Sequence, residues 1–336
     1  MAFRKSDRPQ ISEVFPAAAI PGGEFQIRGK GLAGVDRPNV KFGELSASIV
    51  IGSDSFVIAK VPEGAPAGDM MVGAAPYKCD IGILMADSLH PVSNPVVDHH
   101  GSIYTTFSGS PGQKAPVSIY KIDSHHNAKP LVSDLMNATG LAMDAEGILY
   151  ASSRHDGVVY QVSPGGNLAV FVEGMGVATG IAFDQQDFLY VGDRSGTIFK
   201  ISRERQIYVF ATIEPSIAAY HLAFGPDQCL YVTGPNTSSF DAVQRIDPDG
   251  HVSVFYRGLG RPQGIAFDRD SNLYIAASFA GRRGVVRISP QGHAEHVLSG
   301  SGMVGLALLP TGRSILATNN ALFTLDWDVR GLPLLG

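Results

Sequence analysis

A short apolar pattern recurs six times through residues 93–336 of this 336-residue chain. A typical copy reads Ala178-Thr-Gly-Ile-Ala-Phe-Asp and continues to Leu189-Tyr. Equivalent residues follow one another at spacings of 40 to 46 residues, and they are Ser93, Thr139, Thr179, Tyr220, Gln263 and Val304. A repeat of this length cannot bury its apolar face alone, so consecutive copies must stack on one another.

Each copy divides into four short strands separated by turn residues. In the second copy, the expected strands cover residues 140–144, 148–152, 158–162 and 168–172. Gly147, after the first of them, suits a hairpin turn that needs a positive φ. No copy shows the 3.6-residue period of a helix, which excludes helical repeat arrays. Six four-stranded copies with this period predict an all-β protein with a six-bladed propeller.

Residues 1–76 lack the repeat and predict a small, separate β-sandwich. Residues 24–28 alternate between polar and apolar side chains, as a half-buried strand does. Residues 77–92 then form a linker or a strand that closes the propeller. The last copy has no good fourth strand after Trp327, so we expect apolar residues at 81–84 to supply it.

Five stretches give the N-terminal segment a family character, and they are Ile11-Ser-Glu-Val-Phe-Pro, Gly22-Gly, Ile27-Arg-Gly-Lys-Gly-Leu, Val40-Lys-Phe-Gly and Val61-Pro with Gly68. Together they resemble an IPT/TIG domain, which has an immunoglobulin-like fold. Domains of this kind serve as spacers or interaction modules. The resemblance therefore implies a protein partner for this segment and no chemistry.

The repeated pattern resembles NHL-repeat propellers and the gluconolactonase/regucalcin-like superfamily. Gluconolactonase-like enzymes hold a divalent cation through Glu, Asn and Asp at strand starts. Here the Glu position falls on Ser93, and no carboxylate stands at any of the six strand starts. Because Ca²⁺ needs several oxygen ligands, usually anionic ones, this departure argues against the metal site of the family.

A second metal is suggested by peptidylglycine-lyase-type propellers, which bind zinc through several histidines at strand starts. Only His221 lies near such a position here. Zinc takes three or four nitrogen, sulfur or carboxylate ligands. We therefore predict no metal and no cofactor, although Ca²⁺ or Zn²⁺ is what the related propellers would suggest.

One face of a propeller, here called the mouth, carries both the starts of the innermost strands and the loops between strands two and three. Cationic side chains are concentrated there, whereas the whole chain has a net charge of −5. Arginine suits carboxylate or phosphate, and Asn or Gln amides suit hydroxyl groups. The predicted ligand-binding residues are Asn94, Lys114, Arg154, His155, Asp193, Arg194, Tyr220, His221, Arg261, Gln263, Arg282, Arg283 and Asn319.

Two functions remain open for this mouth. One is binding, without catalysis, of a small anionic or polyhydroxylated ligand such as a sugar acid, lactone or phosphosugar. The other is a gluconolactonase-like hydrolase or a lyase with an altered site, for which the catalytic candidates are His155, Asp193 and Tyr220. The sequence has no Gly-x-Ser-x-Gly nucleophile motif and no carboxylate at a strand start, which favours binding.

Charge and composition narrow the possible partners and the cellular location of the protein. The chain has 26 basic and 31 acidic residues, which argues against a nucleic-acid partner bound through its phosphates. No apolar run approaches the roughly 18 residues of a membrane span, and the first residues lack a signal-peptide pattern. Cys79 and Cys229 read as two free thiols in a reducing compartment. We therefore expect a cytoplasmic protein with no membrane or nucleic-acid partner.

Overall fold

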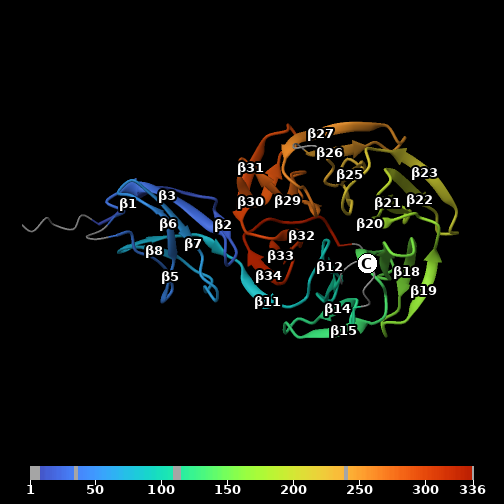
Figure 1. Ribbon diagram of the computed structural model, residues 1–336, viewed down its shortest axis with the longest axis horizontal. Coiled ribbons are helices and arrows are strands. Elements are labelled where there is room, and N and C mark those ends of the chain that lie inside the picture. Colours follow the sequence, from blue (N-terminus) through green and yellow to red (C-terminus); the bar gives the residue numbers. More distant parts are fainter. Residues whose placement is uncertain (1–7, 34–36, 109–114, 238–240, 335–336) are drawn as a thin grey trace, which may run out of the picture.

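The computed structural model is all-β, as predicted, and describes residues 8–33, 37–108, 115–237 and 241–334. These ranges contain only strands, turns and irregular segments, so no described helix can cross a membrane. A small N-terminal body lies beside a ring of β-sheets (Figure 1).

Two four-stranded antiparallel sheets form the N-terminal body. The first contains, in spatial order, β1 (Gln10–Phe15), β3 (Glu24–Lys30), β7 (Phe56–Lys60) and β6 (Ser48–Gly52). The second contains β5 (Leu45–Ser46), β4 (Val40–Phe42), β8 (Met70–Val72) and β9 (Ala75–Tyr77). Phe25 and Ile27 of β3 are buried while Glu24 and Arg28 are exposed. The rings of Phe25 and Phe42 stack with centroids 6.0 Å apart, so the two sheets share one core.

Six further sheets, the blades, form the ring, each with its first strand near the axis and its fourth at the rim (Figure 1). Blade one contains β12 (Val96–Val97), β13 (Ile103–Thr106), β14 (Ile119–Ile122) and β15 (Ala128–Val132). Blade two contains β16 (Ala138–Met143), β17 (Leu149–Ser153), β18 (Val158–Val162) and β19 (Leu168–Val172). Blade three contains β20 (Ala178–Phe183), β21 (Leu189–Asp193), β22 (Thr197–Ile201) and β23 (Ile207–Thr212).

The remaining blades follow the same order. Blade four contains β24 (His221–Phe224), β25 (Leu230–Thr233), β26 (Asp241–Ile246) and β27 (Val252–Leu259). Blade five contains β28 (Ile265–Phe267), β29 (Leu273–Phe279), β30 (Arg282–Ile288) and β31 (Ala294–Ser299). Blade six contains β32 (Met303–Leu308), β33 (Arg313–Thr318) and β34 (Leu322–Asp326), and its fourth strand is β11 (Ile83–Ala86). Because β11 comes from before blade one, its antiparallel pairing with β34 closes the ring.

The N-terminal body continues the sheet of blade five. Its short strand β2 (Ala18–Ala19) pairs in parallel with β31, and β10 (Asp80–Ile81) pairs in parallel with β2. The amide of Ile20 also donates to the carbonyl of Ser299 at 3.0 Å. A six-stranded sheet therefore spans both bodies and fixes one against the other.

The recurring Asp and Tyr of the repeat hold each blade together. In blade three, Oδ1 of Asp184 accepts from the amides of Gln186 and Phe188 at 2.9 Å, and Oδ2 accepts from the Tyr190 hydroxyl at 3.1 Å. The Tyr190 ring meets Phe224 of the next blade edge to face, 4.9 Å between centroids. Blades one and two repeat the Asp–Tyr hydrogen bond. These residues therefore serve turn formation and packing between blades.

We expect Asp184→Ala to lower the free energy of unfolding by about 3 kcal/mol, because three donors lose a charged acceptor. Tyr190→Phe is the matched control, since it removes one hydroxyl and should cost about 1 kcal/mol. Urea unfolding measures both. Equal, small losses in the two variants would show that the turn does not depend on the carboxylate.

Candidate functional site

The structure separates the predicted mouth residues into buried structural groups, a pair of half-buried arginines and an open groove. Lys114 lies outside the described residues. The others are described, and their contacts decide which are available to a ligand.

Asn94 holds three blades together, and its side chain is not available to a ligand. Its Nδ2 donates to the carbonyl of Ile265 at 2.8 Å, and its Oδ1 accepts from the amide of Leu306 at 3.1 Å. The segment leading into blade one is thereby joined to the inner strands of blades five and six. The side-chain amide therefore connects neighbouring blades and does not recognise a ligand hydroxyl.

Tyr220 is a core residue and not an acid at the axis. Its side chain is 3% exposed, and its hydroxyl donates to the carbonyl of Glu214. A Cβ at Gly234 would lie 2.5 Å from its ring, and one at Gly192 would lie 3.1 Å from its Cβ, so the ring fills space left by two glycines. Burial raises the pKa of Tyr220 far above its usual range. The structure therefore gives it a packing role in place of the predicted catalytic one.

His221 is enclosed in the same region and cannot serve as a ligand in the mouth. It is 5% exposed, and burial lowers its pKa from 6.5 to about 4. The imidazole is therefore neutral at physiological pH.

This burial predicts a pH dependence of stability. The unfolded chain protonates His221 below pH 6.5, whereas the folded state resists protonation down to about pH 4. The neutral ring of His221 therefore contributes fully to the free energy of unfolding above pH 6.5. This contribution, about 3 kcal/mol in total, is lost as the pH falls to about 4. His221→Leu should flatten this decline in urea unfolding at pH 7.5 and 4.5. His293→Leu, at an exposed position, is the control, and identical profiles for wild type and His221→Leu would contradict the assignment.

Neither Asp193, a catalytic candidate, nor Asp156 is placed to orient His155 as a base. Oδ1 of Asp193 accepts from the amide of Val177 at 2.8 Å, and its Oδ2 accepts from the Ser195 hydroxyl. Oδ2 of Asp156 accepts from the Tyr160 hydroxyl at 2.8 Å. Within the described ranges, exposed His155 forms no hydrogen bond with either carboxylate. Both aspartates therefore stabilise loops and do not orient a base.

Arg154 and Arg194 lie within electrostatic reach of each other. Burial first, and then the charge of Arg194, lowers the pKa of Arg154. Nη2 of Arg194 donates to the carbonyl of Ile217 at 2.8 Å, and Nη2 of Arg154 lies 3.4 Å from the hydroxyl of Ser108. Neither forms an ion pair with a carboxylate among residues that the structure describes. Both guanidinium groups thus contact neutral oxygen atoms.

A groove of about 270 Å³ opens between blades five and six, and Arg261, Gln263 and Arg283 line it. Gln263 is positioned by its backbone, because its amide donates to the carbonyl of Ala276 at 2.9 Å. Both arginines are exposed, and no described residue forms a hydrogen bond or ion pair with either guanidinium. Asn319 flanks the groove, since its amide donates to the carbonyl of Gly302, a lining residue. These four predicted residues are therefore gathered around one open site.

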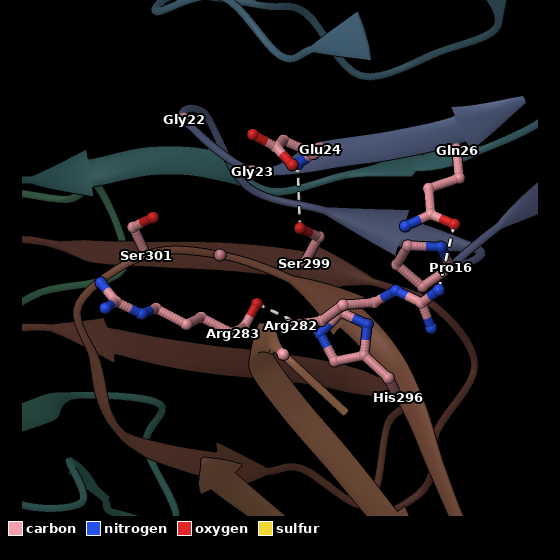
Figure 2. Close-up of a pocket in the computed structure, with 12 residues that line it drawn as sticks. Pro16, Gly22, Gly23, Glu24, Gln26, Arg282, Arg283, His296, Ser299 and Ser301 are labelled. Atoms are coloured by element: carbon pink, nitrogen blue, oxygen red, sulfur yellow. Dashed lines mark hydrogen bonds between the residues drawn. The ribbon is translucent and has the colours of Figure 1, made fainter. Parts of the chain in front are cut away.

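Arg282 lies apart from this groove and joins the two bodies. Its Nη2 donates to Oε1 of Gln26 at 3.1 Å, and its guanidinium lies 4.9 Å from the ring centroid of Phe15. The prediction that it faces a ligand at the mouth is thus replaced by a docking role. Next to it is a second cavity, of about 190 Å³, lined by both bodies (Figure 2).

The sequence predicted Arg282 and Arg283 of this second cavity as ligand-binding residues but missed the others, above all Glu24, His296 and Ser301. They come from segments that show no relation in the sequence. The two-residue strand β2, which brings them together, is too short to give a periodic signal.

One cluster of possible metal ligands occurs among the described residues, and it is Asp247, Asp249 and His251 in the hairpin between β26 and β27. Oδ1 of Asp247 accepts from the amides of Asp249 and His251 at 3.0 and 2.9 Å. Its carboxylate is therefore already used in forming the turn, as turn chemistry predicts for this stretch.

No protein-family profile and no curated protein matches this chain. Among solved structures, a putative gluconolactonase has a TM-score of 0.62 at 16% identity, covering 75% of this chain and 94% of that one. An auxiliary nutrient binding protein from Bacteroides thetaiotaomicron has a TM-score of 0.58 at 11% identity, and the match covers 95% of this chain and 98% of that one. A virginiamycin B lyase from Staphylococcus aureus has a TM-score of 0.52 at 14% identity, and the match covers 74% of this chain and 88% of that one. At these identities the comparisons establish that the chain has a β-propeller fold.

Proposed function

We propose that this protein binds a small anionic, hydroxylated ligand in the groove between blades five and six. The observation that carries the proposal is a pair of exposed guanidinium groups, Arg261 and Arg283, on a groove of about 270 Å³ without a described carboxylate partner. Guanidinium groups bind carboxylate or phosphate through paired hydrogen bonds. The amide of Gln263 offers a donor and an acceptor for hydroxyl groups.

The ligand class that fits is a sugar acid, a lactone or a phosphosugar. The volume lies just below the roughly 300–1,000 Å³ of pockets for drug-sized ligands, as expected for a molecule of monosaccharide size. Similarity to a nutrient binding protein and to a putative gluconolactonase supports this class. Binding without a metal is supported by the strand starts, where the hydroxyls of Thr139 and Thr179 already donate to backbone carbonyls at 2.9 and 2.8 Å.

The alternative is a lactonase-like hydrolase acting on the same face. The fold similarity to the putative gluconolactonase favours it. It requires either a metal or a set of residues other than His155, Asp193 and Tyr220, because two of these three are buried.

For the N-terminal body we propose an IPT/TIG-type module that presents the propeller to a protein partner in the cytoplasm. Its two-sheet sandwich with a single core supports this assignment. Both cysteines are free and buried, which is consistent with the reducing environment of the cytoplasm.

A thermal-shift screen tests the function. The panel contains D-gluconate, glucono-1,5-lactone, 6-phosphogluconate and glucose, each with Ca²⁺, with Zn²⁺ and with EDTA. A ligand at a hundredfold excess over its Kd stabilises the native state by about 2.7 kcal/mol. We expect an acidic sugar to raise the Tm equally with and without EDTA. A shift that requires a metal would favour the lactonase alternative.

We further expect Arg261→Met to weaken binding of the best acidic sugar by roughly 10- to 100-fold, because it removes a charge-assisted contact. Isothermal titration calorimetry measures the Kd. Arg313→Met is the matched control, since Arg313 is paired with Asp326 at 2.9 Å and does not line the groove. Unchanged affinity in a folded Arg261→Met protein would remove the groove from consideration.

A further inference from the structure

A third cavity, which we call the inter-blade pocket, lies between blades one and two, which are neighbours in the ring (Figure 1). It encloses about 500 Å³. Its apolar wall consists of Tyr104 and Leu131 from blade one and Met143, Leu149, Val162 and Leu168 from blade two. The hairpins at 144–148 and 163–167 border it. These hairpins join strands one to two and three to four, so the pocket lies on the face opposite the mouth.

In blades two, three and four, the tyrosine of the second strand is covered by two phenylalanine rings. Tyr190 meets Phe210 of its own fourth strand and Phe224 of the next blade edge to face, with centroids 5.0 and 4.9 Å apart. Tyr150 and Tyr231 have the same two contacts, at centroid distances from 4.8 to 5.1 Å. The space beside this tyrosine is therefore one that aromatic rings fill.

Blade one has the tyrosine, Tyr104, but neither phenylalanine. Leu131 is the bulged residue of β15, which is the position of Phe210 in β23. Met143 ends β16 as Phe224 ends β24, in the same register with the second strand. Leu131 and Met143 thus stand where the two rings are expected, and no described aromatic ring takes their place.

The volumes of the equivalent spaces show what this exchange leaves open. The space beside Tyr190 encloses about 80 Å³, whereas the one beside Tyr104 encloses about 500 Å³. In blade five, Trp327 packs against Tyr274 with centroids 5.8 Å apart. Of the described tyrosines at this position, Tyr104 is therefore the one left without a ring against it. An apolar cavity of this kind binds apolar ligands, and its volume is within the roughly 300–1,000 Å³ of small-molecule pockets.

The charges around the pocket favour an uncharged occupant. Nζ of Lys121 lies 5.3 Å from the ring centroid of Tyr104, so a cationic ligand would meet a like charge. Glu146, which is exposed, lines the pocket at the hairpin, so an anionic ligand would meet one as well. A charged group of either sign would also lose its hydration against the apolar wall.

We infer that the inter-blade pocket is a second binding site, for a small uncharged molecule with fused aromatic rings. The rings of the ligand take the place of the two missing phenylalanines and meet Tyr104 edge to face. Aromatic pairs in this arrangement are stabilised beyond the area that they bury, so a saturated ring system of the same size binds less tightly. The inference does not depend on the proposed function of the mouth groove, because the pocket lies on the other face.

The test uses the full chain with ¹³C-labelled methionine methyl groups, because Met143 lines the pocket and its resonance reports a neighbouring ring. The probes are 2-naphthol, decahydro-2-naphthol, which has the same skeleton without aromaticity, and 2-naphthoate, which carries a charge. We expect 2-naphthol to shift the Met143 resonance upfield and to bind roughly tenfold more tightly than either of the others. Equal affinities for the two alcohols, tighter binding of 2-naphthoate, or an unchanged Met143 resonance at saturation would overturn the inference.

Variants that supply the missing ring locate the site. Leu131→Phe should weaken binding of 2-naphthol by roughly tenfold or more, because it restores the ring found in blades two to four. Leu168→Phe fills the same space from the opposite wall and serves if the first variant does not fold. Leu84→Phe, at an exposed position in β11, is the matched control and should bind as the wild type does. Wild-type affinity in a folded Leu131→Phe or Leu168→Phe protein would show that 2-naphthol binds elsewhere.

Discussion

A chain that begins at residue 93 is expected not to form a closed propeller. It lacks β11, the only described partner for the outer edge of β34. Blade six would then expose a strand edge and lose Met85, Ala86 and Leu89, which belong to or pack against the hydrophobic cluster that contains Leu322 and Ile315. An unpaired edge invites aggregation, and a ring needs its last sheet complete.

The matched comparison is a chain that begins at residue 82, which keeps β11 but lacks the N-terminal body. We expect it to unfold cooperatively, with a lower Tm than the full chain, because the rim strand β31 loses its pairing with β2. The shorter chain should lack a cooperative transition in differential scanning calorimetry. Indistinguishable transitions for the two chains would show that β11 does not close the ring.

Gly284→Ala is expected to cost at least about 4 kcal/mol, because strain and overpacking add at this position. Gly284 has a φ of +153°, and a Cβ there would lie 1.8 Å from the carbonyl oxygen of Leu298. That oxygen belongs to β31, whose backbone must move away from β30. Since Leu298 is opposite Ala18 in the pairing with β2, the docking of the N-terminal body should weaken as well.

Gly292→Ala is the control for this substitution. Its φ is also positive, +81°, but no atom lies within 4 Å of the added Cβ, so only conformational strain of about 1–2 kcal/mol is expected. Urea unfolding measures the free energies, and limited proteolysis of the N-terminal body reports docking. Equal losses in the free energy of unfolding for the two substitutions would mean that the β31 backbone can shift away from β30 without cost.

The arrangement of the propeller could be predicted because the repeat encodes it locally. In blade two, strands expected at 158–162 and 168–172 are found as β18 and β19. The segment expected to complete blade six, at 81–84, overlaps β11 at Ile83–Ala86. Period and turn residues determine the strands within a copy, and the missing fourth strand of the last copy points to the segment that closes the ring by pairing with β34.

The site could be predicted only in part, because a position in the repeat does not fix where its side chain points. Tyr220 and Gln263 occupy equivalent positions, yet Tyr220 is buried between blades and Gln263 lines an open groove. Gly192 and Gly234 make room for the tyrosine ring, and this complementarity appears only once the strands are paired. The docking of the N-terminal body likewise depends on a two-residue strand.

A crystal structure of the full chain with the acidic sugar that gives the largest metal-independent rise in Tm would test the proposed binding groove most directly. We predict ligand density in the groove, with the anionic group between the guanidinium groups of Arg261 and Arg283. Density beside Arg154 and Arg194, or a metal-bound ligand at the axis, would contradict it.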